Sequence, residues 1–298
     1  MTPAEAVEAR PLAVRAQGTL ADYWALTKPD INFLIAIATF AGFCLGFRGR
    51  LEDFPVWRLA QSLTGTLLVA AGTGTLNQYI ERQFDSQMRR TARRPIASGR
   101  LQPWPALWFG AALSIAGGAY LAIAVNMLAS GLAIFTLLSY LFVYTPLKRR
   151  TPLCTLAGAI PGAVPPLIGW AAARGSLSWG AGLLCLILFL WQFPHFMAIA
   201  WMYREDYERA GYRVLPRAQW RAPFAILQTL LPLAGLLVLS AATRQAGALL
   251  LTLMFAYYGV KFTTCRSNAN ARRLLFASIV YLPLVFVWMI HSFLKLSV

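Results

Sequence analysis

The chain is built from long apolar stretches that are separated by short polar segments. Each stretch is close to the ~20 residues that a helix needs to cross a bilayer. Nine can be placed, and they cover residues 29–47, 57–80, 104–124, 126–144, 152–173, 178–203, 222–242, 245–264 and 274–293. They lack the alternation that is typical of barrel strands, and only helices and closed barrels satisfy their backbone hydrogen bonds in lipid. The pattern predicts an all-α polytopic membrane protein of nine transmembrane helices.

Composition places the chain in the same class. Of its 298 residues, 58% are hydrophobic and only 13% are charged, whereas soluble domains carry about 25% charged residues. Residues 1–20 lack the uninterrupted apolar core of a cleaved signal peptide. We therefore expect a short cytoplasmic N-terminal tail, residues 1–22, and one membrane domain, residues 23–298.

The net charge of +16 is distributed unevenly between the two sides of the predicted bundle. Most of the 27 Lys and Arg residues fall in the N-terminal tail and in every second loop. The exceptions are Arg48, Arg50, Arg58, Arg174, Arg244 and Lys295. The positive-inside rule then predicts a cytoplasmic (or matrix) N-terminus and a C-terminus on the opposite side. Because topology accounts for most of the basicity, the charge does not indicate nucleic-acid binding.

A polar stripe interrupts the second apolar stretch, in the sequence LNQYIERQFDSQMRRTARRP of residues 76–95. Asn77, Glu81 and Asp85 follow at intervals of four, which places them within a sector of ~80° on a helix. Polar groups inside a membrane are costly and face a bundle interior or an aqueous cavity. Two carboxylates at this spacing repel each other, and a cation such as Mg²⁺ relieves the repulsion. The alternative is an ordinary charge pair at a helix end.

Two further charged segments are predicted on the same side. The sixth stretch ends in Glu205, Asp206 and Glu208, and the fourth loop, YTPLKRRT, carries Lys148 and Arg149. Carboxylates that hold a divalent cation, together with Lys and Arg, suit a pyrophosphate group. Such a clamp stabilises the charge that develops when a C–O bond to diphosphate ionises. Since the rest of the site opens into lipid, the other half of the substrate is expected to be apolar, which describes prenyl transfer.

The stretch 76–95 resembles the first aspartate-rich motif of the UbiA-type intramembrane prenyltransferases. It departs from the motif at Gln78 and Glu81, where many members have aspartate. The resemblance implies nine helices around a central cavity, with Mg²⁺ as the cofactor that ionises a prenyl diphosphate. It implies that the Mg²⁺ ligands are Asn77, Glu81, Asp85 and, from the second acidic segment, Asp206. It implies that the diphosphate partners are Arg82, Arg90, Arg94, Lys148 and Arg149. It implies catalytic roles for Asn77, Glu81, Asp85 and Lys148.

Six further segments narrow the resemblance to the protoheme IX farnesyltransferase (haem O synthase) branch. They are LTKPDI (26–31), YTPLKRRT (144–151), GAVPPLIGWAA (162–172), WQFPHFMAIA (191–200), REDYERAGYRVLP (204–216) and ARRLLFASIVYLPL (271–284). The branch transfers the farnesyl group of farnesyl diphosphate to the 2-vinyl group of haem b, with hydroxyl addition, giving haem O and diphosphate for terminal oxidases. The resemblance implies a bacterial plasma (inner) membrane protein with its active site facing the cytoplasm. Its further partners would be membrane lipid and a haem A synthase or terminal oxidase.

Haem as a substrate makes His195 a candidate contact, because this histidine follows Pro194 inside an apolar stretch. Two roles are open to His195: it ligates the haem iron, or it binds a haem propionate. The alternative is that it only packs against neighbouring side chains. Two other functions compete with the leading one. The first is a UbiA-type transferase for an aromatic or chlorophyll-type acceptor. The second is a transporter for an anionic, lipid-like solute, which basic clusters and broken helices would also suit.

Overall fold

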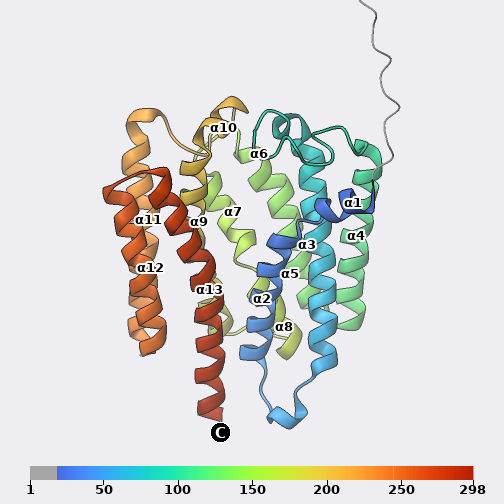
Figure 1. The fold of residues 1–298 in the computed structure, drawn as a ribbon. Helices are drawn as coiled ribbons and strands as arrows, with labels where there is room; N and C mark the ends of the chain where they lie inside the picture. Colours follow the sequence, from blue (N-terminus) through green and yellow to red (C-terminus); the bar gives the residue numbers. More distant parts are fainter. Residues whose placement is uncertain (1–18, 244, 298) are drawn as a thin grey trace, which may run out of the picture.

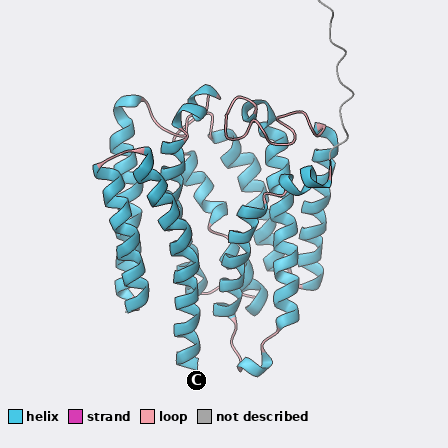
Figure 2. Cartoon of the chain, in the orientation of Figure 1, coloured by secondary structure: helices cyan, strands magenta, loops and turns pink. Residues whose placement is uncertain are grey.

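The computed structural model describes residues 19–243 and 245–297. These residues form helices and connecting loops and contain no strand (Figure 2). Most of the helices run roughly parallel to one another, and the C-terminus lies at the end of the bundle away from α1 (Figure 1). The all-α prediction is therefore confirmed. The predicted tail, residues 1–22, lies largely outside the described residues and stays a prediction.

The first part of the chain supplies one short helix and three long ones. The elements are α1 (Leu20–Leu26), α2 (Pro29–Gly46), the 3₁₀ turn η1 (Leu51–Asp53), α3 (Val56–Asp85) and α4 (Pro103–Ala124). Thr19 and Asp22 form a capping box that begins α1. α3 and α4 pack closely because small residues meet there; a Cβ on Gly117 would lie 2.8 Å from the Gly65 carbonyl oxygen.

The central part of the chain contains two interrupted spans. The first runs through α5 (Met127–Leu138), the π-helical turn η2 (Ser139–Tyr144) and α6 (Thr145–Leu147). The second consists of α7 (Cys154–Gly162) and α8 (Pro165–Arg174). Proline cannot donate a backbone hydrogen bond, so Pro165 and Pro166 occupy the first two positions of a new helix instead of continuing α7.

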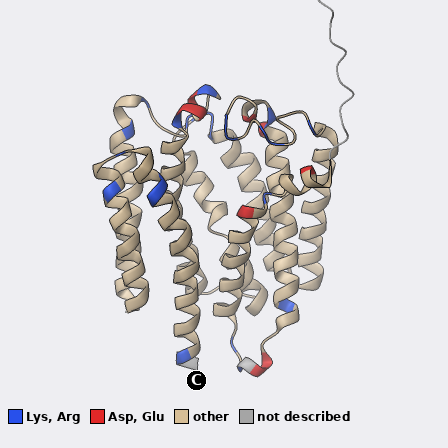
Figure 3. Ribbon diagram, viewed as in Figure 1, with Lys and Arg blue, Asp and Glu red and all other residues tan. Residues whose placement is uncertain are grey.

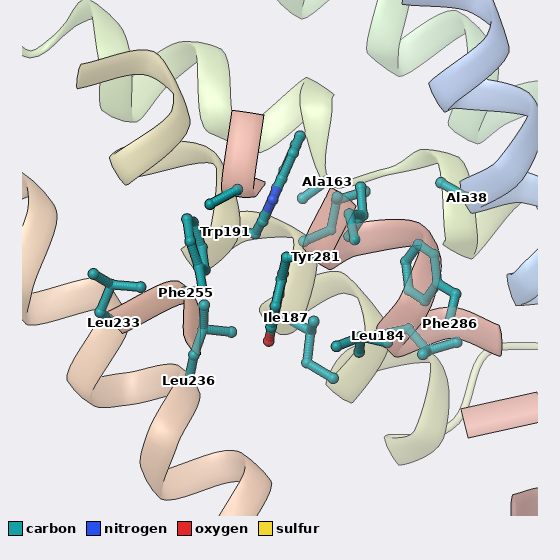
Figure 4. Packing of buried hydrophobic residues seen from close by; sticks show 14 of the residues in the cluster. Ala38, Ala163, Leu184, Ile187, Trp191, Leu233, Leu236, Phe255, Tyr281 and Phe286 are labelled. Carbon is teal, nitrogen blue, oxygen red and sulfur yellow. The ribbon is translucent and has the colours of Figure 1, made fainter. Parts of the chain in front are cut away.

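The last part of the chain is more regular. It comprises α9 (Trp179–Met202), the short α10 (Arg204–Arg209), α11 (Ala218–Ala242), α12 (Ala246–Thr264) and α13 (Asn268–Ser297). α9, α11, α12 and α13 share a core of large side chains, shown in Figure 4. Within it, the Phe255 and Tyr281 rings stack with centroids 4.9 Å apart.

Eight spans of the described chain are long and apolar enough to cross a membrane. They coincide with eight of the nine predicted stretches. The remaining stretch, 57–80, lies within α3, a continuous helix of 30 residues. Its threonines, glycines and Gln61 make it less apolar than the others, so its place as a ninth span stays a prediction. The charged loops after α3, α6 and α10 gather at one end of the bundle (Figure 3).

Candidate active site

The polar stripe of α3 forms one buried group, as its spacing predicts. Asn77, Glu81 and Asp85 are only 1%, 5% and 1% exposed. The Asn77 amide nitrogen donates to Glu81 Oε2 at 2.9 Å and to Thr145 Oγ1, at the start of α6, at 3.3 Å. The first hydrogen bond fixes the Asn77 amide against the Glu81 carboxylate one turn away, and the second fixes it against α6.

Lys148 is the cation that neutralises Glu81. Its Nζ donates to Glu81 Oε1 at 2.9 Å and to Oε2 at 3.1 Å. Burial alone would lower the pKa of Lys148, but attraction to the Glu81 carboxylate outweighs it and holds the pKa well above its ordinary value. The Lys148 ammonium also lies 4.5 Å from the centre of the Tyr144 ring. The carbonyl of Lys148 accepts from the Arg213 backbone N–H at 2.7 Å, which ties this loop to the one after α10.

Asp85 pairs with a different cation. Arg94 Nη1 donates to Asp85 Oδ2 at 2.7 Å, and the Thr91 hydroxyl donates to the Asp85 carbonyl at 2.9 Å. These two contacts fold the arginine-rich segment back over the end of α3. The other carboxylate oxygen, Asp85 Oδ1, is buried and has no hydrogen-bond partner in the part of the chain that the structure describes. A buried carboxylate oxygen without a partner is costly unless a cation occupies the space beside it.

The second acidic segment contributes one buried carboxylate. Asp206 Oδ2 accepts from the Arg90 backbone N–H at 3.2 Å, which joins α10 to the loop after α3. Glu205 and Glu208 are exposed instead and pair with Arg204 and Arg221. Between residues 19 and 297, leaving aside 244, no three His, Cys, Asp or Glu side chains are placed to hold a metal without further ligands.

Three of the arginines selected from the sequence lie beside the carboxylates without pairing with them. Arg82 lies 4.6 Å from the Tyr79 ring centre, Arg90 lies 5.1 Å from that of Tyr203, and Arg149 lies 4.7 Å from that of Phe84. Arg82 also donates to the Tyr79 carbonyl at 2.7 Å. Among the predicted diphosphate partners, the structure therefore joins only Arg94 and Lys148 to the α3 carboxylates.

Lys28 is a site residue that the sequence analysis missed. Its Nζ donates to Asn77 Oδ1 at 2.8 Å. The backbone at Lys28 is left-handed, with φ of 54°, which is uncommon for a residue other than glycine and turns the chain between α1 and α2. Burial, with repulsion from Arg94 and Lys148 as the next causes, lowers the pKa of Lys28 to about 7.

Thr145 and Tyr212 were missed as well. Thr145 contacts Asn77. The hydroxyl of the buried Tyr212 makes no hydrogen bond to any of the described residues. Burial is the main cause that raises the pKa of Tyr212, with the nearby Glu81 carboxylate adding to it. Lys28, Thr145 and Tyr212 each lie in a segment that carries the family resemblance, so those segments held the signal.

A cavity of about 350 Å³ extends from these polar groups into the bundle. Lys28 and Tyr144 line its polar end. Its walls come from α2, α3, α5, η2, α7, α8, α9 and α13. The π-helical turn brings the Tyr140 and Tyr144 rings to 5.1 Å from each other. Gly158 lets α7 approach Tyr144, because a Cβ there would lie 2.7 Å from the ring. π-helical turns such as η2 are frequent at functional sites.

His195, on α9, lines the same cavity. Its Nδ1 lies 2.8 Å from the Ser278 hydroxyl on α13, and its ring stacks on Trp191 with centroids 4.8 Å apart. Trp191 in turn donates to the Ser278 carbonyl at 2.8 Å. Hydrogen bonding and stacking therefore fix the ring while one of its edges borders the cavity.

The sequence and the fold both match known proteins. The UbiA prenyltransferase family matches residues 35–291. The protoheme IX farnesyltransferase of Solibacter usitatus (strain Ellin6076) is 46% identical over 286 residues, which cover 89% of this chain and 96% of that protein. The mitochondrial protoheme IX farnesyltransferase of Homo sapiens is 37% identical over 273 residues, which cover 89% of this chain and 60% of that protein.

Solved structures with low sequence identity share the fold. One, from work on digeranylgeranylglyceryl phosphate synthase, superposes with a TM-score of 0.71 at 16% identity and covers 93% of this chain and 99% of its own. A UbiA homolog from Archaeoglobus fulgidus, bound to DMAPP and Mg²⁺, gives a TM-score of 0.59 at 14% identity, covering 90% of this chain and 98% of its own. On the extent of the family match and the identity to its relatives, the chain belongs to the UbiA prenyltransferase family.

Proposed function

We propose that this protein transfers the farnesyl group of farnesyl diphosphate to the 2-vinyl group of haem b, with addition of a hydroxyl group, to give haem O and diphosphate. The observation that carries the proposal is the group Asn77, Glu81 and Lys148, which contacts Lys28 and Tyr144 at the polar end of an apolar cavity. Relatives that carry the name protoheme IX farnesyltransferase match almost the whole chain and support this choice of substrates.

The carboxylates fit a magnesium site that the substrate completes. Mg²⁺ usually takes one or two carboxylates and fills its remaining positions with water and phosphate oxygens. The unpartnered oxygen of Asp85 fits such an ion, and Asn77, Glu81 and Asp206 would be the further ligands. When bound, Mg²⁺ neutralises the charge that develops on the departing diphosphate. The protein shares its fold with an archaeal homolog that is bound to DMAPP and Mg²⁺, and this shared fold supports a magnesium site.

The cations at the polar end would bind the diphosphate oxygens. Lys148 and Arg94 are held by Glu81 and Asp85, and Lys28 lies against Asn77. A phosphate oxygen that replaces a carboxylate oxygen keeps each cation in a charge-assisted hydrogen bond. The pairs would thus hold the cations in place before the substrate arrives, which reduces the ordering that binding requires. Arg82, Arg90 and Arg149 would need new side-chain rotamers to join them.

The apolar cavity would take the farnesyl chain and the edge of the haem. Its walls exclude water from the allylic cation that forms when the C–O bond breaks. The faces of Tyr140 and Tyr144 are placed to stabilise a passing cation. His195, which also lines the cavity, would contact the haem.

The proposal extends to topology and location. We infer nine transmembrane helices around the cavity, with α3 as the ninth span and a cytoplasmic N-terminus. The active site would then face the cytoplasm of a bacterial inner membrane, which the gathering of charge at that end supports. Haem O would pass to a haem A synthase or a terminal oxidase.

One experiment tests the function directly. The purified protein is incubated with haem b, farnesyl diphosphate and Mg²⁺, and the products are separated and weighed by mass spectrometry. We expect haem O and one diphosphate per haem O, and no product when Mg²⁺ is chelated. Haem left unchanged while an aromatic or chlorophyll-type acceptor is prenylated would support the other transferase function. No diphosphate release with any acceptor would contradict both.

A further inference from the structure

Gln192, on α9, carries a buried amide to which the proposed function assigns no role. It is 3% exposed and lines the cavity. Its amide nitrogen donates to the Leu188 carbonyl at 3.0 Å and to the Ala159 carbonyl at 3.1 Å. Both N–H groups are thus engaged and the amide cannot rotate. Within residues 19–243 and 245–297, its oxygen Oε1 accepts no hydrogen bond.

His195 presents a second acceptor from the same helix. The Ser278 hydroxyl lies 2.6 Å from the Leu275 carbonyl, and since a carbonyl only accepts, the hydroxyl proton points there. The Ser278 oxygen is then left to accept from His195 Nδ1, 2.8 Å away. This arrangement puts the imidazole proton on Nδ1 and leaves a lone pair on Nε2.

The two acceptors lie close together on the cavity wall. Residues three apart are neighbours on the surface of a helix, and Gln192 and His195 both line the cavity. The threonines that also line it direct their hydroxyl protons elsewhere: Thr66, Thr73 and Thr136 each donate to a carbonyl of their own helix. An apolar wall that holds two fixed acceptors side by side is suited to one water molecule, which has two protons to donate.

We propose that Gln192 and His195 hold the water that supplies the hydroxyl group of the product, and that His195 Nε2 removes its proton. The inference rests on the proposed function. A water that donates to Gln192 Oε1 and to His195 Nε2 directs its oxygen lone pairs away from α9, toward the substrate. Both residues are then catalytic, and Ser278 is a positioning residue that acts through His195.

The C–O bond of farnesyl diphosphate breaks and its electron pair leaves with the diphosphate. The π electrons of the vinyl group form a C–C bond to the farnesyl carbon, which leaves a cation on the vinyl carbon next to the ring. The water oxygen donates an electron pair to that carbon, and one proton passes to His195 Nε2 and then to the departing diphosphate or to solvent. Haem b, farnesyl diphosphate and water thus give haem O and protonated diphosphate.

The test is the ratio of two products. If water is not held in place, the cation loses a neighbouring proton instead, and the prenylated haem is lighter by one water. We expect His195→Ala to lower the ratio of hydrated to unhydrated product by about 10²-fold, the size of a general-base contribution. Gln192→Leu, which removes one hydrogen bond, should lower it about tenfold. Ser278→Ala should lower the ratio in the same direction and less.

Controls separate this role from packing. Thr136→Val alters the same cavity but removes a hydroxyl that donates only to Leu132, so the ratio should not change. In water labelled with ¹⁸O, the wild-type product should carry the label. Variants that make less product at an unchanged ratio would overturn the proposal, and so would a His195→Ala absorption spectrum showing that bound haem has lost an axial ligand. If the wild type yields no prenylated haem at all, the proposed function fails instead.

Discussion

The two ends of the cavity hold their polar groups by different means. At the polar end, each carboxylate of the α3 stripe is matched by a cation from a loop, as in Glu81 with Lys148 and Asp85 with Arg94. On the cavity wall formed by Gln192 and His195 of α9, which we call the deep end, an amide and an imidazole are fixed by carbonyls of α7 and α9 and by a hydroxyl of α13. Charge attraction acts over several ångströms and tolerates flexible loops, whereas neutral hydrogen bonds need rigid helix packing. The polar end is therefore suited to release diphosphate, and the deep end to hold one water in a fixed place.

The largest effect is expected at Asp85, which we propose as a metal ligand. Asp85→Ala removes a buried oxygen that has no hydrogen-bond partner among the described residues, and it leaves Arg94 without its carboxylate. We expect haem O formation to fall by at least ~10³-fold, because the electrostatic contribution to leaving-group departure is lost. Haem O is measured at saturating Mg²⁺, and membrane insertion is checked by the yield of monodisperse protein. Asp30→Ala, an exposed carboxylate at the start of α2, is the matched control, and activity near wild type in Asp85→Ala would remove Asp85 from the metal site.

A second test compares how a change at the polar end affects the affinity for farnesyl diphosphate and the affinity for haem. Lys148→Met keeps the length of the side chain but removes the charge, so the apparent Kd for farnesyl diphosphate should rise about 10²-fold while that for haem changes little. Breaking a buried pair also costs about 3 kcal/mol of folding stability, so the melting temperature should fall. Lys261→Met, on an exposed face of α12, controls for loss of charge alone. A larger loss of haem binding than of diphosphate binding would contradict the assignment of the polar end.

The polar end was largely predictable from the sequence, and the deep end was not. A spacing of four placed Asn77, Glu81 and Asp85 on one face because helix geometry is fixed by the backbone. The break between α7 and α8 also follows from local sequence, because Pro165 occupies the first position of α8. The contact between His195 and Ser278 joins residues far apart in the chain, and it depends on the register between α9 and α13. No local pattern encodes that register. Lys28 lies in a segment that carries the family resemblance, but its place in the site depends on a left-handed turn that the hydrophobic pattern does not show.

The deep end is tested through its packing by Gly162→Ala. A Cβ at this position would overlap Gln192 Oε1, so the amide must move and its two hydrogen bonds weaken. We expect the hydrated-to-unhydrated product ratio to fall by up to about tenfold, together with a loss of stability of about 1–3 kcal/mol from overpacking. Gly182→Ala, on α9 with open space around it, should change neither. An unchanged ratio in Gly162→Ala, with the stability loss present, would show that the position of Gln192 does not control the water.

The smallest expected effect is a pH dependence at the polar end that the deep end lacks. Because the pKa of Lys28 is lowered to about 7, the side chain is cationic below that pH and becomes neutral as the pH rises through it. A bound diphosphate favours the cation and raises the pKa, so binding takes up a proton above pH ~7. The affinity for farnesyl diphosphate should therefore weaken a few-fold from pH ~6 to ~8, while haem affinity stays level. Lys28→Arg keeps its charge at both pH values, so its affinity for farnesyl diphosphate should change less between them. The diphosphate's own ionisation affects both proteins equally and cancels when the two are compared. If Lys28→Arg shows the same slope as the wild type, the titrating group lies elsewhere.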